Sequence, residues 1–359
     1  MADTPLTLWL DDTGADAGPL VGGKFSSLAE MSQAGFGVPP AFAVTTASYR
    51  SFLAHHGFAD ELAAVKTLDR DDLDAVDRVS ATITRAIENA DLPSAVSDAI
   101  RTAYTALCER TGSDSVPVAV RSSGVAEDLA GASFAGQYET YLWIVGIDSV
   151  LEHVRRCWAG LFGPAVLTYH PTDADFHSSE LGMAVVVQEM VRPRAAGVAF
   201  TLDPVSGDRS KIVVEAAWGL GEAVVGGEVT PDRYRVDKVM LEILERTVVE
   251  KPVEYRFEVG SGVQLREVPA DRRNTSSLTD DHLIELATLA KRIERHRGAP
   301  QDIEWAVDET DRVHVLQVRP ETVWSQRERE SAAAPSSNPL DHVFGTFMGG
   351  FVAPKKDNA

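Results

Sequence analysis

The sequence contains few cysteines and no long hydrophobic run. Two of its 359 residues are cysteines, Cys108 and Cys157, and their spacing matches neither a zinc site nor a disulfide framework. We interpret them as two reduced thiols. No segment approaches the roughly 18–20 uninterrupted apolar residues of a membrane helix. The N-terminus also lacks the basic segment and apolar run of a signal peptide. These absences predict a cytoplasmic protein with no membrane partner.

Positive charge is also scarce. The chain has 34 Lys and Arg residues against 54 Asp and Glu residues, a net charge of −20. We therefore expect no nucleic-acid partner. A polyanionic ligand would need a site with its own cations, glycine amides or metal. The pattern GxxxxGK[ST] and a GxGxxG after a first strand are both missing, and the nine histidines form no metal or triad pattern.

Glycine-containing segments are the first candidates for a phosphate site. Gly22 and Gly23 precede Lys24 and an amphipathic pattern, so Lys24 should lie where a glycine turn enters a helix and where free amides favour phosphate. Arg121 ends a predicted strand, and its planar guanidinium suits contact with phosphate oxygens. The loop 131–137 could lay backbone amides over a terminal phosphate. Taken singly, each segment is better explained by a turn.

Two predicted strands near the end of the sequence carry a second group of polar residues. Asp302 and Glu304 are two apart, as are Gln317 and Arg319, so each pair shares one face of its strand. If the strands are neighbours, carboxylate and amide oxygens suited to Mg²⁺ lie beside a guanidinium. The alternative is a surface salt bridge between Glu304 and Arg319. Because neighbouring carboxylates repel, we expect replacement of Glu304 by alanine to leave the stability unchanged or to raise it.

A third candidate is the end of a nearly continuous apolar run, 183–191, which predicts a buried strand. Gln188, Glu189 and Met190 lie where this strand leaves the core. Backbone N–H and C=O groups there could contact the edge of an adenine, while Met190 packs on the ring. The alternative is that Met190 fills the core.

The remaining patterns predict a mixture of helices and strands. Residues from about 60 to 110 indicate several amphipathic helices with a break at 91–94. Thr279 is the expected N-cap of a helix that stops at 297–300. Strands are expected at 116–121, 197–201, 211–216, 302–307 and 313–318, and a linker, 331–339, precedes a short apolar tail.

Together these segments resemble the ATP-binding module of the phosphoenolpyruvate synthase and pyruvate phosphate dikinase family, to which rifampin phosphotransferase and phenylphosphate synthase also belong. The matching segments follow the family order over residues 21–322: VGGKFSSLAEM, GVPPAFAVTTASY, VAVRSSGVAEDLAGASFAGQYET, VVVQEMV, GVAFTLDPVSG, VVEAAWGLGEAVVGGEVTPD and DIEWAVD with VLQVRPET. The resemblance implies an α+β, ATP-grasp-like fold whose two lobes enclose a nucleotide cleft. It implies an N-terminal lobe at 1–190 with a helical insertion at about 55–110, a C-terminal lobe with the metal site at 191–325, and a linker with an apolar tail at 326–359.

The resemblance also assigns roles to the residues that match the family's motifs. Lys24, Arg121 and Arg319 are implied to be catalytic, in contact with the phosphates of ATP, and Glu304 and Gln317 are implied to hold Mg²⁺. The implied ATP-binding residues are the glycine loop over the terminal phosphates (Gly131, Ala132, Ser133, Gly136 and Gln137), the adenine hinge (Gln188, Glu189 and Met190) and Asp302. ATP-grasp ligases usually end their metal site with Glu-x-Asn, so the sequence QVR at 317–319 favours the synthase family.

Full-length family members continue into a swivelling domain whose phosphorylatable histidine follows Thr/Ser-Cys/Ser, a segment that this sequence lacks. The resemblance therefore implies an ATP-dependent phosphotransferase of the dikinase type. It needs a partner subunit with the histidine and the acceptor-binding domain, and it converts ATP to AMP and Pi. The most specific expectation is the ATP-binding subunit of phenylphosphate synthase, with phenol as the acceptor. The alternatives are the ATP-binding module of a phosphoenolpyruvate synthase or rifampin phosphotransferase-like enzyme, an ATP-grasp ligase, and a non-catalytic nucleotide-binding regulatory subunit.

Overall fold

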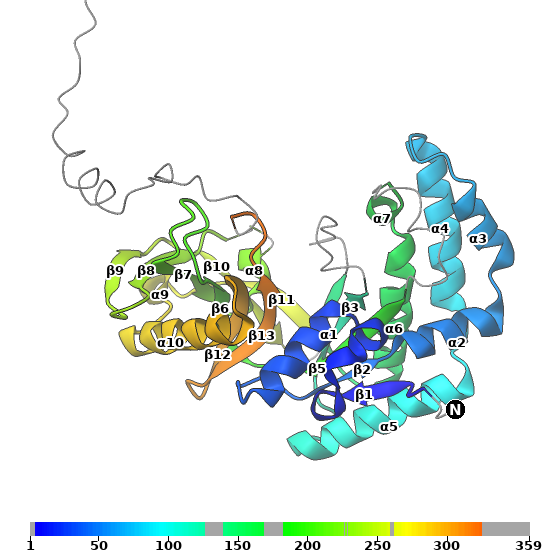
Figure 1. Cartoon of the computed structure of the whole chain (residues 1–359), viewed down its shortest axis with the longest axis horizontal. Helices are drawn as coiled ribbons and strands as arrows, with labels where there is room; N and C mark the ends of the chain where they lie inside the picture. Colours follow the sequence, from blue (N-terminus) through cyan, green and yellow to red (C-terminus); the bar gives the residue numbers. More distant parts are fainter. Residues whose placement is uncertain are drawn as a thin grey trace, which may run out of the picture. The chain divides into compact units, whose positions relative to one another are not determined.

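The computed structural model describes residues 4–125, 139–168, 182–225, 227, 229–258 and 262–324 (Figure 1). The chain divides into one unit at 1–321 and a second at 322–359, and every element below belongs to the first. The predicted glycine loop 131–137 and the predicted tail lie outside the described residues. Within them, helices and antiparallel sheets are mixed, which confirms the predicted α+β class. None of the described helices is long and apolar enough to cross a bilayer.

The first part of the chain builds a five-stranded sheet with its helices. Its strands run in the order β1-β2-β5-β3-β4, and all neighbours pair antiparallel. The elements, in chain order, are β1 (Thr7–Trp9), α1 (Gly18–Gln33), β2 (Ala41–Val44), α2 (Thr46–His56), α3 (Ala59–Lys66), α4 (Leu73–Asn89), α5 (Ser94–Thr111), β3 (Val118–Gly124), β4 (Thr140–Ile144), α6 (Ile147–Ala159), α7 (Pro164–Thr168) and β5 (Met183–Glu189). Three short 3-10 turns, Leu10–Asp12, Ala15–Ala17 and Gly160–Phe162, complete the described part.

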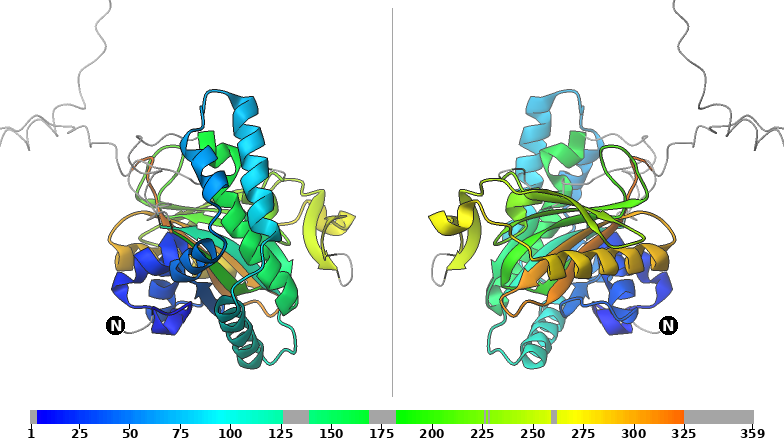
Figure 2. Two further views of the ribbon diagram at one scale, coloured as in Figure 1. Left: turned by 90° about the vertical axis from the view of Figure 1, so that its right-hand side faces the viewer. Right: turned by 90° about the vertical axis from the view of Figure 1, so that its left-hand side faces the viewer.

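The two faces of this sheet are covered by different helices. On β5, Val185 and Val187 join the large core formed with α2, α4, α5 and α6, whereas Val186 packs in a smaller core with α1. This alternation is the period-two pattern of a strand buried on both faces. The left-hand view of Figure 2 shows α4 and α6 side by side over the first face. Arg121 lies directly opposite Val186 in the sheet and so shares the face that carries α1.

The second part builds a six-stranded antiparallel sheet in the order β13-β12-β6-β7-β8-β9. Its strands are β6 (Pro193–Phe200), β7 (Lys211–Trp218), β8 (Asp232–Asp237), β9 (Ile243–Thr247), β12 (Gln301–Asp308) and β13 (Val313–Pro320). A hairpin of β10 (Val253–Glu258) and β11 (Gly262–Glu267) and the helices α8 (Glu222–Val225), α9 (Ala270–Arg273) and α10 (Asp280–Arg297) complete it. One face packs on α10, as the right-hand view of Figure 2 shows, and the alternate residues face the other way.

Helix α10 forms as the sequence predicts. The Thr279 hydroxyl accepts a hydrogen bond from the amide of His282, and Gly298 ends the helix in the left-handed conformation. The apolar side chains that recur every three or four residues are buried against the sheet, among them Leu283, Leu286, Ala290 and Ile293. The predicted helices between residues 60 and 110 are also present, as α3, α4 and α5, with a break between Asn89 and Ser94. The division into lobes at residue 190, between β5 and β6, stays a prediction.

Candidate functional site

Gly22 interrupts α1 and allows it to lie directly on β3. Its φ of 73° and ψ of 170° are outside the helical region, in a part of conformational space that is essentially reserved for glycine. A β-carbon added at Gly22 would lie 2.1 Å from the carbonyl oxygen of Ser123. The Ser123 hydroxyl donates to the carbonyl of Val21 at 2.9 Å and accepts from the amide of Phe25 at 3.3 Å. The predicted glycine turn at the helix entry is therefore present, and it is fastened to β3.

Lys24 follows this turn and points back to the same strand. It is 8% exposed, and its Nζ donates to the carbonyl oxygen of Ser122 at 3.0 Å. Ser122 is the residue after Arg121. The two predicted phosphate-binding cations, one from α1 and one from β3, are thus brought to neighbouring positions by contacts that no short-range pattern in the sequence specifies.

The guanidinium of Arg121 joins the first sheet to the second. Its Nη1 donates to the carbonyl of Leu316 at 3.1 Å, and its Nη2 donates to Glu304 Oε2 at 3.2 Å and to Gln317 Oε1. The Arg121 side chain is 11% exposed. Arg319 Nη2 donates to the other Glu304 oxygen, Oε1, at 2.7 Å. Four of the predicted site residues are thereby in direct contact.

The register of β12 and β13 explains why these side chains meet. Glu304 lies directly opposite Gln317, and Asp302 lies opposite Arg319, which confirms that the two strands are neighbours. Between Glu304 and Trp305 the register shifts, so Leu316 has no partner on β12. Such a bulge re-aims the backbone, and here the Leu316 carbonyl accepts from Arg121. The predicted site requires these two strands to be neighbours, and the structure meets this condition, whereas nothing in the sequence predicts the bulge.

The Glu304 carboxylate is not the isolated surface partner of Arg319 that the alternative interpretation supposed. Its side chain is 19% exposed and shared between two arginines. Burial alone would raise the pKa of Glu304, but Arg121 and Arg319 outweigh burial and hold the pKa below its ordinary value. Glu304 is therefore a carboxylate at neutral pH.

Asp302 differs from Glu304 although it shares the same face of β12. Burial and the nearby Glu321 raise the pKa of Asp302 to about 6, against the opposing effect of Arg319. Its Oδ1 is buried and has no hydrogen-bond partner in the described part of the chain. Such an orphaned acceptor is costly unless something binds it. The predicted ATP-binding residue thus has an unused oxygen two residues from Glu304.

The polar groups around Glu304 fit a magnesium ion better than a transition metal. Glu304 and Gln317 offer one carboxylate and one amide oxygen, while the buried Gln317 Nε2 has no partner among the described residues. No group of three or more His, Cys, Asp or Glu side chains suited to a metal occurs in the described ranges. Mg²⁺ typically takes one or two protein oxygens and completes its shell with water and substrate phosphates. The donor set is therefore compatible with Mg²⁺ brought in with a nucleotide.

The predicted hinge lies at the end of β5. Gln188 is 2% exposed, and Glu189 and Met190 are half-buried. The amides of Glu189 and Met190 donate to the carbonyls of Pro40 and Pro117, both at 2.9 Å. These N–H groups are already used, so contact with an adenine would fall to the carbonyl groups or to side chains. The buried Gln188 Nε2 has no partner among the described residues.

Sequence reasoning missed an aromatic hollow beside this hinge. A cavity of about 100 Å³ is lined by Trp143, Arg192, Pro193, Leu220, Tyr255, Arg256, Phe257 and Glu309. The ring of Trp143 stacks on that of Phe257, with centroids 4.4 Å apart and planes inclined by 14°. Trp143 has a positive φ of 60° and lies on β4, whose register against β3 shifts between Val118 and Val120. An irregular backbone position of this kind has no signal in the sequence.

On the face of the second sheet that carries Glu304, two further charged residues lie beyond Val198. Glu304 is opposite Val198, Val198 is opposite Glu215, and Glu215 is opposite Arg233. Directly opposed residues share a face of the sheet. Glu215 and Arg233 are therefore on the same face as the Glu304 site, two and three strands away from β12.

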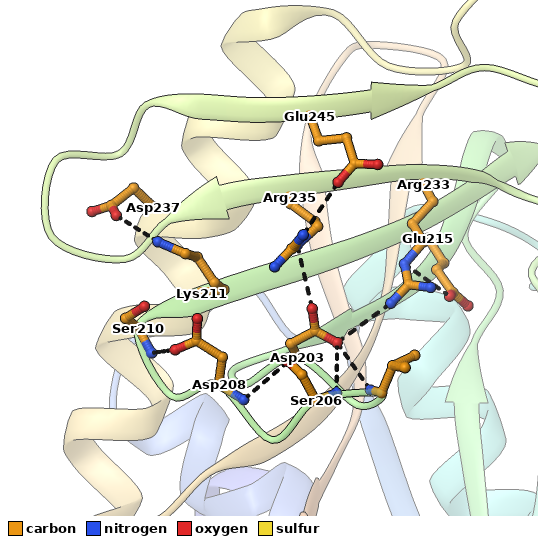
Figure 3. Close-up of polar contacts among 11 residues, drawn as sticks. Asp203, Ser206, Asp208, Ser210, Lys211, Glu215, Arg233, Arg235, Asp237 and Glu245 are labelled. Carbon is orange, nitrogen blue, oxygen red and sulfur yellow. Dashed lines mark hydrogen bonds and ion pairs between the residues drawn. The ribbon is translucent and has the colours of Figure 1, made fainter. Parts of the chain in front are cut away.

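Asp203 fastens the loop after β6 to this face (Figure 3). Its Oδ1 accepts from the amides of Val205 and Ser206 at 2.9 and 3.3 Å. Its two oxygens also pair with Arg233 and Arg235, at 3.5 and 3.3 Å. Burial alone would raise the pKa of Asp203, but these amides and arginines together hold it below its ordinary value.

The arginines of this network are shared with further acids. Arg233 Nε lies 4.0 Å from Glu215 Oε1, and Arg235 Nη1 lies 3.3 Å from Glu245 Oε2. Two arginines thus meet three carboxylates, counting Asp203. We interpret the network as an internally compensated support for the loop rather than as a site for an anion.

Several known proteins are similar to this chain in sequence. The model of the pyruvate phosphate dikinase AMP/ATP-binding domain matches residues 18–338. A probable phosphoenolpyruvate synthase of Methanothermobacter thermautotrophicus is 44% identical over 324 residues, covering 90% of this chain and 47% of that protein. The probable phosphoenolpyruvate synthase of Methanocaldococcus jannaschii is 41% identical over 326 residues, covering 90% of this chain and 27% of that protein. The phosphoenolpyruvate synthase of Aeropyrum pernix is 40% identical over 360 residues, covering 92% of this chain and 44% of that protein.

This chain spans less than half the length of each of these three relatives. Among solved structures, D-alanyl-alanine synthetase A of Vibrio cholerae aligns with 62% of this chain and 46% of its own, at 14% identity and a TM-score of 0.26, a likeness too low to carry an argument. The family match covers most of the sequence, including β3, β12 and β13, the strands that carry Arg121, Glu304, Gln317 and Arg319. The chain therefore belongs to the family of the pyruvate phosphate dikinase AMP/ATP-binding domain.

Proposed function

We propose that this chain is the ATP-binding part of a dikinase-type phosphotransferase of the phosphoenolpyruvate synthase kind. The observation that carries the proposal is the contact of Arg121 with Glu304 and Gln317, next to Lys24. In a chain with a net charge of −20, a local group of cations is what a triphosphate requires.

The proposed roles follow from the donors and acceptors. Lys24, Arg121 and Arg319 bind the phosphates of ATP, with the planar arginines suited to paired oxygens. Glu304 and Gln317 hold Mg²⁺, which neutralises phosphate charge when bound. Asp302 contributes its unpartnered oxygen to the same site.

The adenine is assigned to the hinge at 188–190 and the adjacent aromatic hollow. Arg192 and Pro193, which line the hollow, follow the hinge directly in the chain. Trp143 and Phe257 provide an apolar wall, and base edges then meet carbonyl or side-chain groups because the hinge amides are occupied. The glycine loop 131–137, which the resemblance assigns to the terminal phosphates, lies outside the described residues.

The proposed reaction passes the β- and γ-phosphates of ATP to a histidine of a partner subunit. AMP leaves, and water then releases the distal phosphate as Pi, so one phosphoryl group stays on the histidine. The residues of this chain position the triphosphate and neutralise its charge, which is how most catalysis of phosphoryl transfer arises. The names of the relatives favour phosphoenolpyruvate as the final product over the phenylphosphate expected from the sequence.

Labelled ATP tests this proposal. Calorimetry should first show that the chain binds Mg-ATP. With a histidine-bearing partner present, label from the γ-position should appear in Pi, and label from the β-position should appear on the partner's histidine. Pyruvate or phenol added next identifies the acceptor by the product that carries the β-label. Formation of ADP instead of AMP would contradict the dikinase assignment and favour a ligase, and binding without turnover would favour a regulatory subunit.

A further inference from the structure

Helix α1 contacts both strands that carry the phosphate-binding candidates. At Lys24 it contacts the carbonyl of Ser122 on β3. At Ser27 the side-chain hydroxyl donates to the carbonyl of Val318 on β13 at 2.7 Å. Lys24 and Ser27 are three residues apart, so they lie on one face of the helix. A single turn of α1 thus contacts two strands, β3 next to Arg121 and β13 next to Arg319.

The hydroxyl of Ser27 is held in one orientation. Arg297, in the last turn of α10, donates from Nη2 to Ser27 Oγ at 2.6 Å. A guanidinium can only donate, so the Ser27 proton is directed to Val318. The same arginine pairs through Nη1 with Glu30 Oε2 at 2.8 Å, which ties it to the next turn of α1.

The backbone that Ser27 contacts is at the edge of the second sheet. Among the described strands none pairs with the outer side of β13, and the Val315 amide instead donates to the carbonyl of Gly37 at 2.8 Å. Val318 lies between Gln317 and Arg319 and two residues after the Leu316 bulge. A bulged edge strand is prone to local displacement, and the contact with Ser27 restrains it at the position where Gln317 and Arg319 project.

We propose that Ser27 is a positioning residue that sets the placement of Gln317 and Arg319 relative to Lys24 and Arg121. The inference rests on the proposed function, because positioning matters only if these groups act on one ligand. Loss of the hydroxyl removes this hydrogen bond between α1 and β13 while every charged side chain of the site remains. A displacement of about 1 Å in such a site can lower a rate by about 100-fold.

Ser27→Ala, with Ser26→Ala as the matched control, tests this role. Ser26 is half-buried on the same helix and makes no side-chain hydrogen bond to a described residue. The quantities to measure are the ATP affinity in EDTA, the ATP affinity in Mg²⁺, and the rate of single-turnover AMP formation with the histidine-bearing partner. For Ser27→Ala we expect the ATP affinity in EDTA to stay within about threefold of wild type. The increase in ATP affinity on adding Mg²⁺ should be at least fivefold smaller than in wild type, and AMP formation should be slower by about 10- to 100-fold. Ser26→Ala should match wild type, and Ser27→Thr, which keeps the hydroxyl, should recover most of the loss.

The inference would be overturned if Ser27→Ala lowered the melting temperature but left the Mg²⁺-dependent increase in ATP affinity and the rate of AMP formation unchanged. Ser27 would then be merely structural. If Ser27→Ala does not fold, Arg297→Lys provides the second variant. This variant keeps a positive charge that can pair with Glu30 but loses the separate N–H group that donates to Ser27. The increase in ATP affinity on adding Mg²⁺ should therefore also be smaller than in wild type. An unchanged increase in that variant would equally reject the role. Failure of wild type to bind ATP would instead reject the proposed function.

Discussion

Arg121 and Glu304 are 183 residues apart in the sequence, yet Nη2 of the arginine lies 3.2 Å from Oε2 of the glutamate. Arg319 contacts the second oxygen of the same carboxylate. The residue expected to hold Mg²⁺ is therefore bound by two residues expected to hold phosphate. Under the proposed roles, phosphate oxygens and Glu304 would compete for the same guanidinium groups, and Mg²⁺ and the guanidinium groups would compete for the same carboxylate.

This competition predicts opposite effects of Glu304→Gln on two affinities. The amide no longer holds the arginines as a charged partner, so ATP in EDTA should bind about 3- to 10-fold more tightly, a gain of about 1 kcal/mol. The gain in affinity on adding Mg²⁺ should largely disappear, because a carboxylate ligand is lost. Calorimetric titrations with and without Mg²⁺ measure both changes. Glu250→Gln, at an exposed position, is the control for net charge. Weaker binding in both titrations would refute the competition.

Replacing Glu304 with alanine should lower the stability, contrary to the expectation from the sequence. That expectation treated Asp302 and Glu304 as mutually repelling acids. The structure instead gives Glu304 two arginine partners. Removing one partner of a buried ion pair leaves the others uncompensated and costs about 3–5 kcal/mol, here about 2–4 kcal/mol since Arg319 is about a third exposed. Urea unfolding of Glu304→Ala and wild type gives the difference, and an equal or higher midpoint for the mutant would restore the original expectation.

Gly22→Ala should be strongly destabilising, whereas Gly14→Ala should not. The new methyl group would meet the Ser123 carbonyl at 2.1 Å, and φ of 73° is unfavourable for alanine. Strain of this kind and overpacking each cost about 1–3 kcal/mol. At Gly14, shortly before α1, φ is −74° and ψ is 161°, which alanine also adopts, and no atom beyond the adjacent residues lies within 4 Å of an added β-carbon. Melting temperatures of the two variants should therefore diverge, and similar values would show that α1 can move away from β3.

Asp203→Asn should cost stability in a pH-dependent way. The fold lowers the pKa of Asp203, so its charge stabilises the native state above the unfolded pKa of about 4. That contribution is lost as the pH falls through the folded pKa. At pH 7 we expect a loss of about 1–3 kcal/mol, because Arg233 and Arg235 lose their shared partner. The difference from wild type should narrow below about pH 4.

Urea midpoints at pH 7, 5 and 3.5 measure this trend. Glu250→Gln, at an exposed position, is the control for the loss of one negative charge. A difference that stays constant with pH would show that Asp203 acts through its turn hydrogen bonds and not through its charge.

Local patterns in the sequence predict local structure well. The Thr279 cap and the apolar spacing of α10 are short-range features, and the structure confirms both. The strands at 302–307 and 313–318 are also expected from the sequence, and the structure has them as β12 and β13. The glycine turn before Lys24 is equally local, because the backbone conformation of Gly22 is available to few other residues.

The contacts within the candidate site depend on long-range packing and cannot be derived from such patterns. The bulge at Leu316 arises from a one-residue register shift, which the apolar alternation of β13 does not reveal. Arg121 contacts Glu304, 183 residues away, and no local pattern in the sequence predicts this contact. The stack of Trp143 on Phe257 joins two edge segments 114 positions apart, 257 minus 143. Family resemblance supplied the candidates, and tertiary packing supplied their arrangement.

The place of β13 as the last strand of the described fold has a consequence for biosynthesis. This strand supplies acceptors to Arg121 and Ser27 across 195 and 291 residues of chain. A growing polypeptide that ends before residue 313 already has every strand of the five-stranded sheet but none of these acceptors. Contacts of such high sequence separation form late. Under the proposed function, the complete nucleotide site can therefore form only after β13 has been synthesised.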